Sequence, residues 1–207
     1  MKATNKTTAS EILKECPALR KKEMLLLEFS EIIKLPLEDM RQNWLEALPK
    51  IQNVQRLSAK NLTADAQTMS VLYHLPKLFS KAKESGKILN CYRNGTPIEE
   101  TVPDVNEAPQ LIAIANGPLS ELQTMCYIDG IPIFEAHGCE AIFLLLAVYW
   151  CFQVQFPQNA KQQFAFIAIA VLKDVAIRDI SADILKKITL TTVLKSCDLL
   201  PAMSAKK

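Results

Sequence analysis

The sequence contains little glycine and none of the short motifs that identify the common enzyme classes. Its five glycines in 207 residues are too few for a β-sandwich or a propeller, because tight turns depend on glycine. The phosphate-loop, Rossmann, HExxH and GxSxG patterns are absent. The six cysteines show no CxxC or CxxH spacing, which argues against a zinc site built from local knuckles. We therefore predict a protein that is not an enzyme and has no catalytic residue, metal or cofactor.

The chain also lacks an excess of charge of either sign. Its 24 basic and 22 acidic residues give a formal charge of +2, so charge alone implies neither nucleic acid nor an anionic membrane as a partner. We interpret the two local concentrations of basic residues as solvated helix faces, and a surface that contacts phosphates is the alternative. These concentrations are Lys14, Arg20, Lys21 and Lys22, and then Lys77, Lys81, Lys83 and Lys87.

What is present is the composition of a globular protein. Hydrophobic residues make up 49% of the chain and charged residues 22%, close to the average for folded domains. We expect a single domain over 1–207, with a flexible tail at 1–10 and a loose end at 204–207. The first residues lack the apolar stretch of a secretory signal. We therefore expect an intracellular protein, cytoplasmic or nuclear, with reduced cysteines.

The first half of the chain predicts helices. A stripe near 3.6 periodicity consists of Met24, Leu25, Leu27, Ile32 and Ile33. We expect a second helix over 37–47, which Pro49 follows. Thr63 is expected to cap a third helix, in which Met69, Leu72 and Tyr73 point inward. Pro76 would then either divide this helix into two or kink it.

The middle of the chain predicts a small antiparallel sheet. Residues 90–109 are rich in turn formers, which indicates an irregular connection. Strands are expected over 111–115, 124–128 and 131–134. Asp129 and Gly130 join the last two as a hairpin, because both residues tolerate positive φ. Pro132 lacks an amide donor, so its strand should be short or at the sheet edge.

Residues 140–153 predict a helix that is apolar on every face. Twelve helical residues span about 18 Å, whereas a bilayer core is about 30 Å thick. We therefore interpret this helix as buried at the centre of the protein, with insertion into a membrane as the alternative. A helix over 160–175 would form a helical hairpin with it, and Ser181 would cap a last helix through Ser196. The expected fold is α+β and mainly helical.

Two groups of residues could carry chemistry. Cys139 and His137 lie at the start of the buried helix, where a Cys–His nucleophile pair would be favoured. We favour the interpretation that His137 helps to cap this helix and that Cys139 packs in the core, and the nucleophile pair is the alternative. The carboxylates of Glu99, Glu100, Asp104 and Glu107 would be solvated, and a weak calcium site is their alternative role, although they do not match an EF-hand loop.

Residues 111–172 resemble the carboxyl-terminal region of uncharacterised animal proteins that contain a sterile alpha motif or are associated with transposons. The similar features are a strand, an Ile-Asp-Gly hairpin, and a helix ending in Tyr-Trp-Cys-Phe-Gln-Val-Gln-Phe-Pro, followed by a helix with Phe-Ala-Phe-Ile near its start. No sterile alpha motif is apparent in this chain, and no transposase carboxylate set maps onto it. The resemblance implies an intracellular module, of mobile-element origin, and supplies no catalytic residue.

These observations favour a non-catalytic module that binds another protein. The strand edge at 131–134 and the connection at 90–109 are the two surfaces that could receive such a partner. A nucleic-acid-associated protein of mobile-element origin is one alternative. An enzyme that uses Cys139 and His137 is the other. The biological process, the partner and the oligomeric state do not follow from the sequence.

Overall fold

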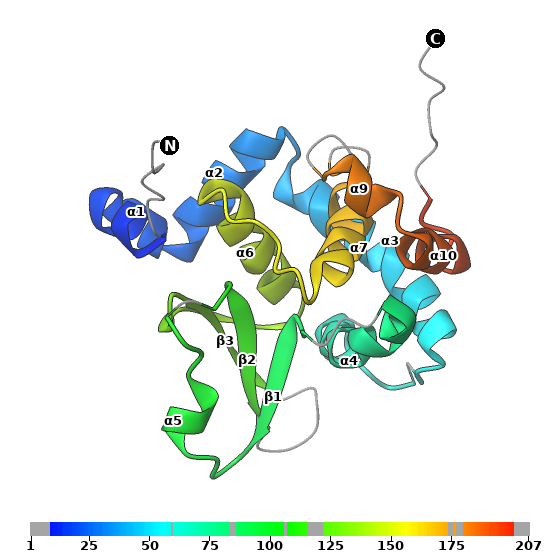
Figure 1. Ribbon diagram of the computed structural model, residues 1–207, viewed down its shortest axis with the longest axis horizontal. Helices are drawn as coiled ribbons and strands as arrows, with labels where there is room; N and C mark the ends of the chain where they lie inside the picture. The colour runs from blue at the N-terminus through cyan, green and yellow to red at the C-terminus, as the bar shows by residue number, and fades with distance from the viewer. Residues whose placement is uncertain are drawn as a thin grey trace.

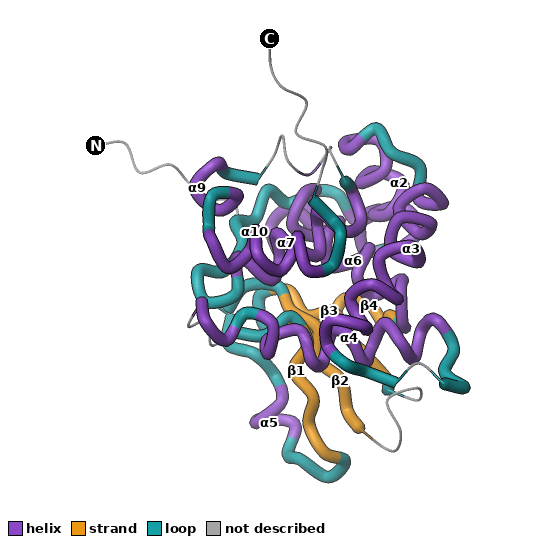
Figure 2. The backbone as a smooth tube through the Cα atoms, turned by 90° about the vertical axis from the view of Figure 1, so that its right-hand side faces the viewer, coloured by secondary structure: helices purple, strands orange, loops and turns teal. Residues whose placement is uncertain are grey.

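Most of the helices lie together on one side of the sheet, whereas a short helix at Ile98–Thr101 lies beside the strands (Figure 1). The computed structural model describes residues 9–58, 60–82, 86–105, 107–115, 122–173, 176 and 180–200. The expected α+β fold, mainly helical, is confirmed. The strands lie below the helical layer when the molecule is turned by 90° as well (Figure 2). The predicted tail at 1–10 and the end at 204–207 fall outside the described residues, except for the start of the first helix.

The described residues up to Leu78 form four α-helices and one short 3-10 helix. They are α1 (Ala9–Glu15), η1 (Pro17–Arg20), α2 (Lys22–Ile33), α3 (Leu37–Gln55) and α4 (Ala64–Leu78). The stripe predicted for α2 is wrong in part, because Met24, Leu27 and Ile32 are exposed. The side that packs on the rest of the protein consists of Leu25, Leu26, Phe29 and Ile33. Leu25, Phe29 and Ile33 follow the i, i+4, i+8 spacing of one helix face, and Leu26 widens that face.

Helix α3 does not end before Pro49, as the sequence predicts, but continues through it to Gln55. A proline inside a helix loses one backbone hydrogen bond and strains the preceding turn. The buried face of α3 compensates for this loss, because Trp44 and Ile51 are fully buried on either side of the proline. Packing therefore overrides the local preference here.

Helix α4 begins as predicted. The Thr63 hydroxyl accepts a hydrogen bond from the backbone N–H of Ala66 at 3.2 Å. Met69 and Leu72 are buried, but Tyr73 is exposed, contrary to the prediction. The Tyr73 ring instead contacts that of His74. Pro76 lies in the last turn of α4, so the helix is one piece.

The sheet has four strands in the order β1-β2-β3-β4. They are β1 (Leu89–Arg93), β2 (Gln110–Ala115), β3 (Gln123–Ile128) and β4 (Ile131–Ala136). The hairpin between β3 and β4 is confirmed, with positive φ at both Asp129 (51°) and Gly130 (74°). Pro132 lies in β4, which is an edge strand as predicted.

Two predictions about this region need correction. The sheet is mixed rather than antiparallel, because β1 pairs with β2 in parallel. The connection predicted to be irregular over 90–109 contains most of β1 and also the short helix α5 (Ile98–Thr101). Parallel pairing requires a crossover segment, and α5 with its flanking turns provides it.

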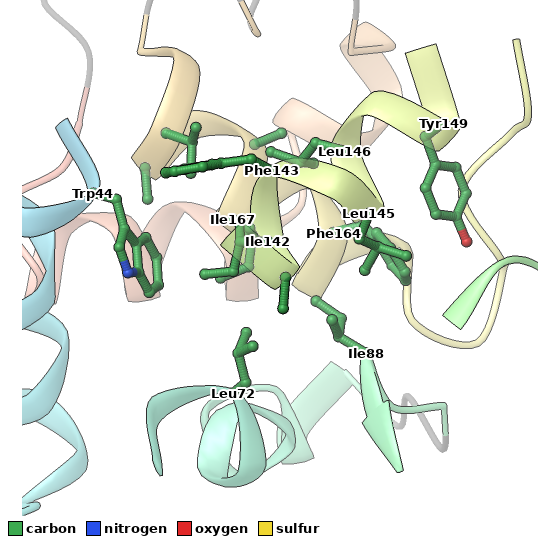
Figure 3. Close-up of a cluster of buried hydrophobic side chains, with 14 of the residues drawn as sticks. Trp44, Leu72, Ile88, Ile142, Phe143, Leu145, Leu146, Tyr149, Phe164 and Ile167 are labelled. Atoms are coloured by element: carbon green, nitrogen blue, oxygen red, sulfur yellow. The ribbon is translucent and has the colours of Figure 1, made fainter. Parts of the chain in front are cut away.

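Helix α6 (Gly138–Cys151) confirms the buried central helix. Every residue from Ala141 to Tyr149 is buried, and the helix packs mainly against α2, α4 and the sheet. Its side chains meet those of Trp44, Leu72 and Ile88 in one cluster (Figure 3). The polar head of Tyr149 donates a hydrogen bond to the Pro109 carbonyl at 2.8 Å, as burial of a phenol requires.

The remaining helices are α7 (Lys161–Leu172), α9 (Ala182–Leu185) and α10 (Ile188–Ser196), preceded along the chain by η2 (Ser80–Ala82). The predicted single helix from Ser181 to Ser196 is wrong, because extended backbone at Lys187 divides it, and the Ser181 side chain makes no capping bond. Helices α6 and α7 meet through the rings of Tyr149 and Phe164, whereas α7 packs mainly on α3. Within the described residues, no helix is both long and apolar enough to span a membrane.

Candidate protein-interaction surface

The structure does not bring Cys139 and His137 together as a catalytic pair. Cys139 is buried, its Sγ lies 3.4 Å from the Thr68 hydroxyl, and burial raises the pKa of its thiol. His137 is more than half exposed, and its Nε2 lies 3.5 Å from a Glu135 carboxylate oxygen. A nucleophilic thiolate requires a lowered pKa and an adjacent base. The geometry of Cys139 is that of a packed core residue.

A residue that the sequence analysis did not single out caps α6. The Asp65 carboxylate accepts a hydrogen bond from the backbone N–H of Cys139 at 3.0 Å. His137, which was expected to cap this helix, makes no side-chain capping bond. Gly138 has a φ of 52°, and a Cβ at this position would collide with the Asp65 carboxylate. Asp65 and Gly138 therefore form a structural contact between α4 and α6.

The predicted basic and acidic residues lie on the surface. Lys77, Lys81 and Lys87 are exposed, and Lys83 lies outside the described residues. The carboxylates predicted to be solvated are exposed, namely Glu99, Glu100, Asp104 and Glu107. Within the part of the chain that the structure describes, no three histidine, cysteine or carboxylate side chains converge as metal ligands.

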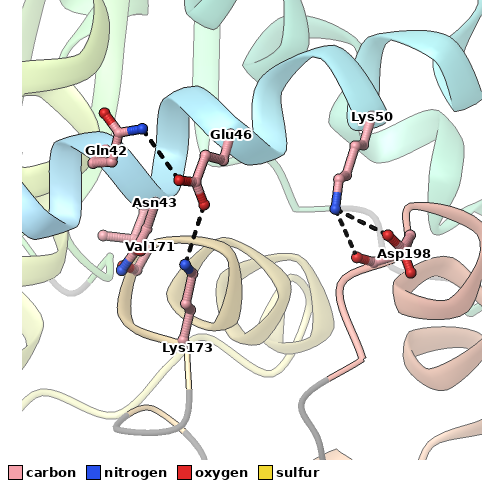
Figure 4. A network of polar contacts seen from close by, with 7 residues as sticks. All are labelled: Gln42, Asn43, Glu46, Lys50, Val171, Lys173 and Asp198. Atoms are coloured by element: carbon pink, nitrogen blue, oxygen red, sulfur yellow. Dashed lines mark hydrogen bonds and ion pairs between the residues drawn. The ribbon is translucent and has the colours of Figure 1, made fainter.

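A polar arrangement lies between α3, the end of α7 and the segment after α10 (Figure 4). Lys173 pairs with Glu46 at 3.2 Å and Lys50 with Asp198 at 3.0 Å, around a cavity of about 280 Å³. The hydrogen bond from Gln42, and then that from Lys173, lowers the pKa of Glu46. Because these ion pairs are largely exposed, each contributes little stability. We interpret them as ties between the helices.

A groove of about 820 Å³ runs between α2, the segment after α6 and α9. Trp150 and Phe156 line it with their rings, which meet edge to face. Lys161 and Asp183 also line the groove, and Lys161 donates a hydrogen bond to Gln158. Polar and apolar side chains are interspersed along the groove, which favours no single ligand chemistry. We therefore assign it no function.

Four exposed apolar side chains lie on α5, on the segment after it and at the start of β4. The exposed fractions are 71% for Ile98, 37% for Val102, 68% for Val105 and 49% for Ile131. We call these four residues the hairpin patch. A Cβ added to Gly130 would lie 3.0 Å from the Pro103 carbonyl oxygen and 3.5 Å from a Val105 methyl group. This close approach joins the α5 segment to the hairpin turn.

Hydrogen bonds fix the segment that carries the hairpin patch. The Thr101 hydroxyl is buried and donates to the Ile98 carbonyl at 2.9 Å. The Val102 N–H donates to the same carbonyl at 3.0 Å. Ile98 and Val102 are therefore exposed on a hydrogen-bonded helical turn, and binding through such a turn costs less conformational entropy than binding through an irregular chain.

The position of α5 leaves the hairpin patch accessible. In Figure 1, α5 lies on the opposite side of the strands from α4, and both Figure 1 and Figure 2 show α5 apart from the helical layer. The sequence predicts the strand edge at 131–134 and the connection at 90–109 as separate partner surfaces, and the structure brings Pro103 and Val105 of that connection next to the hairpin turn at Gly130. The sequence could not show this, because the contact at Gly130 joins segments that are distant along the chain.

Comparison with protein-family models, with curated proteins and with solved structures finds no significant match for this chain. The resemblance of residues 111–172 to transposon-associated proteins therefore stays a prediction.

Proposed function

We propose that this chain is a non-catalytic module that binds another protein through the hairpin patch. The observation that supports the proposal is the exposure of Ile98 and Val105, 71% and 68%, on backbone turns that local hydrogen bonds close. Single exposed apolar residues are common in proteins, but a group of them on one ordered surface is typical of an interaction site. All six cysteines are free thiols, which supports an intracellular location.

Site-specific photo-crosslinking tests this proposal. A photo-reactive amino acid replaces Val105 in one version of the protein and Ile188 in another. Ile188 is the matched control, since it is 84% exposed but lies on α10, outside the hairpin patch. We expect a discrete adduct in cells from position 105 alone. The additional substitution Ile98→Glu should abolish this adduct, whereas Ile188→Glu should not.

Two results would contradict the proposal. One is an identical set of adducts from both positions, which would indicate random collisions. The other is an adduct from position 105 that survives Ile98→Glu. Both substitutions replace exposed side chains, so unchanged thermal unfolding should accompany them and serves as the control for folding.

A further inference from the structure

The surroundings of the hairpin patch are strongly acidic, although the whole chain is not. Residues 88–110 and 128–134 contain five carboxylates and a single basic residue, Arg93, in a chain of net charge +2. Four of the five carboxylates are exposed and the fifth is partly exposed. They are Glu99, Glu100, Asp104, Glu107 and Asp129.

The carboxylates lie within a few residues of the apolar side chains. Glu99 and Glu100 follow Ile98 on α5, Asp104 precedes Val105, and Asp129 is in the hairpin turn next to Gly130. An apolar centre with a charged rim is the usual anatomy of an interface. A rim of one sign also selects its partner, because like charges repel and opposite charges accelerate the encounter.

We propose that the partner of the hairpin patch is a basic segment, in which apolar side chains alternate with lysine or arginine. This inference rests on the proposed function and adds the chemistry of the partner. The apolar side chains of the segment would contact Ile98 and Val105. Its cations would reach the carboxylates of Glu99, Glu100 and Asp104. Acidic segments and nucleic acid would be repelled by the same rim.

Fluorescence anisotropy with labelled peptides tests the partner chemistry on the full chain. The probe is a peptide of alternating lysine and leucine. One control peptide carries glutamate in place of lysine and another carries serine in place of leucine. We expect the lysine–leucine peptide to bind at least about tenfold more tightly than either control, and its affinity to fall as salt is added.

Charge reversal on the protein locates the binding site. Glu99→Lys combined with Glu100→Lys should weaken the lysine–leucine peptide about tenfold. Glu28→Lys is the matched control, because Glu28 is exposed on α2, away from α5, and its reversal should leave the affinity within about twofold. Circular dichroism checks that all variants remain folded.

Each other outcome overturns the inference in a distinguishable way. Equal binding of the lysine and glutamate peptides would exclude a basic partner. Equal weakening by Glu28→Lys would show non-specific attraction. A third outcome separates the two proposals. Ile98→Glu would remove the Val105 adduct, while Glu99→Lys with Glu100→Lys would change neither the adduct nor the binding of the peptide. The chain would then still be an interaction module, but its partner would not be basic. Self-association in sedimentation velocity that Ile98→Glu removes would make a second copy the occupant.

Discussion

The Asp65 carboxylate and the backbone N–H of Cys139, 3.0 Å apart, join the first turn of α4 to the first turn of α6. Helix N-termini carry unpaired N–H groups and a partial positive charge, so a carboxylate stabilises them. The central helix of this protein is therefore capped by a side chain from another helix. This contact requires a residue without a Cβ at position 138, where φ is 52°.

The contact between Asp65 and the start of α6 predicts that replacing Gly138 destabilises the protein. We expect Gly138→Ala to lower the free energy of unfolding by about 3 kcal/mol, from left-handed backbone strain plus displacement of the carboxylate. Gly95→Ala is the matched control, because Gly95 also has positive φ but no heavy atom within 4 Å of the added Cβ, and it should cost only about 1 kcal/mol. Urea denaturation measures both.

The same contact predicts non-additivity between its two residues. Asp65→Ala alone should cost about 1 kcal/mol, the usual value of a helix cap. In the Asp65→Ala background, Gly138→Ala should cost less than it does alone, since the colliding carboxylate is gone. Strictly additive losses in the double variant would show that the collision does not contribute.

Local signals predicted part of this fold, and contacts between distant segments decided the rest. The Asp129–Gly130 hairpin and the Thr63 cap depend on neighbours in the sequence, and both are confirmed. Strand β1 was missed because its partner β2 follows only after α5. The cap on α6 was missed because its acceptor lies 74 residues away.

The candidate site shows the same division. The sequence indicated both the segment at 90–109 and the strand at 131–134, because turn formers and a strand proline are local signals. The close approach of Val105, in the first segment, to Gly130, in the hairpin turn, is a tertiary contact that the periodicity of the sequence does not indicate. Pro49 is the opposite case, in which a local preference to end the helix was overridden by the packing of a helix face.

The Thr68 hydroxyl contacts two buried side chains, those of Trp44 and Cys139, so replacing it should destabilise the protein. The hydroxyl accepts a hydrogen bond from Trp44 Nε1 at 2.9 Å, and Thr68 and Trp44 are both fully buried. We expect Thr68→Val to cost about 2 kcal/mol in urea denaturation, because the indole N–H is left without an acceptor. Thr192→Val, at an exposed helix position, should stay within about 0.5 kcal/mol. A similar loss for both would indicate a helix-propensity effect.

The cysteines should differ in reactivity in the folded state. Cys16 is exposed, whereas Cys126 is fully buried in β3, where burial raises the pKa of its thiol to about 12. Cys139 is buried and its pKa is also raised. We expect a thiol reagent at neutral pH to label Cys16 first and to label Cys126 and Cys139 only after unfolding. Rapid labelling of Cys139 in the folded protein would revive the hypothesis of a nucleophile.

We expect the protein to become less stable at mildly acidic pH because of His74. Burial, and then the charge of Lys77, lowers the pKa of His74 below its ordinary value of 6.5. Within the described residues its Nδ1 is buried without a hydrogen-bond partner. The unfolded chain therefore binds a proton more readily than the folded protein, and the free energy of unfolding falls as the pH drops below 6.5 toward the lowered pKa.

Urea denaturation at each pH tests this prediction. The decrease in the free energy of unfolding between about pH 7.5 and about pH 5 should be smaller in His74→Gln than in the unmodified protein. His137→Gln, at an exposed position, serves as the control and should follow the unmodified protein. Equal pH profiles for the unmodified protein and His74→Gln would show that carboxylates alone govern the acid response.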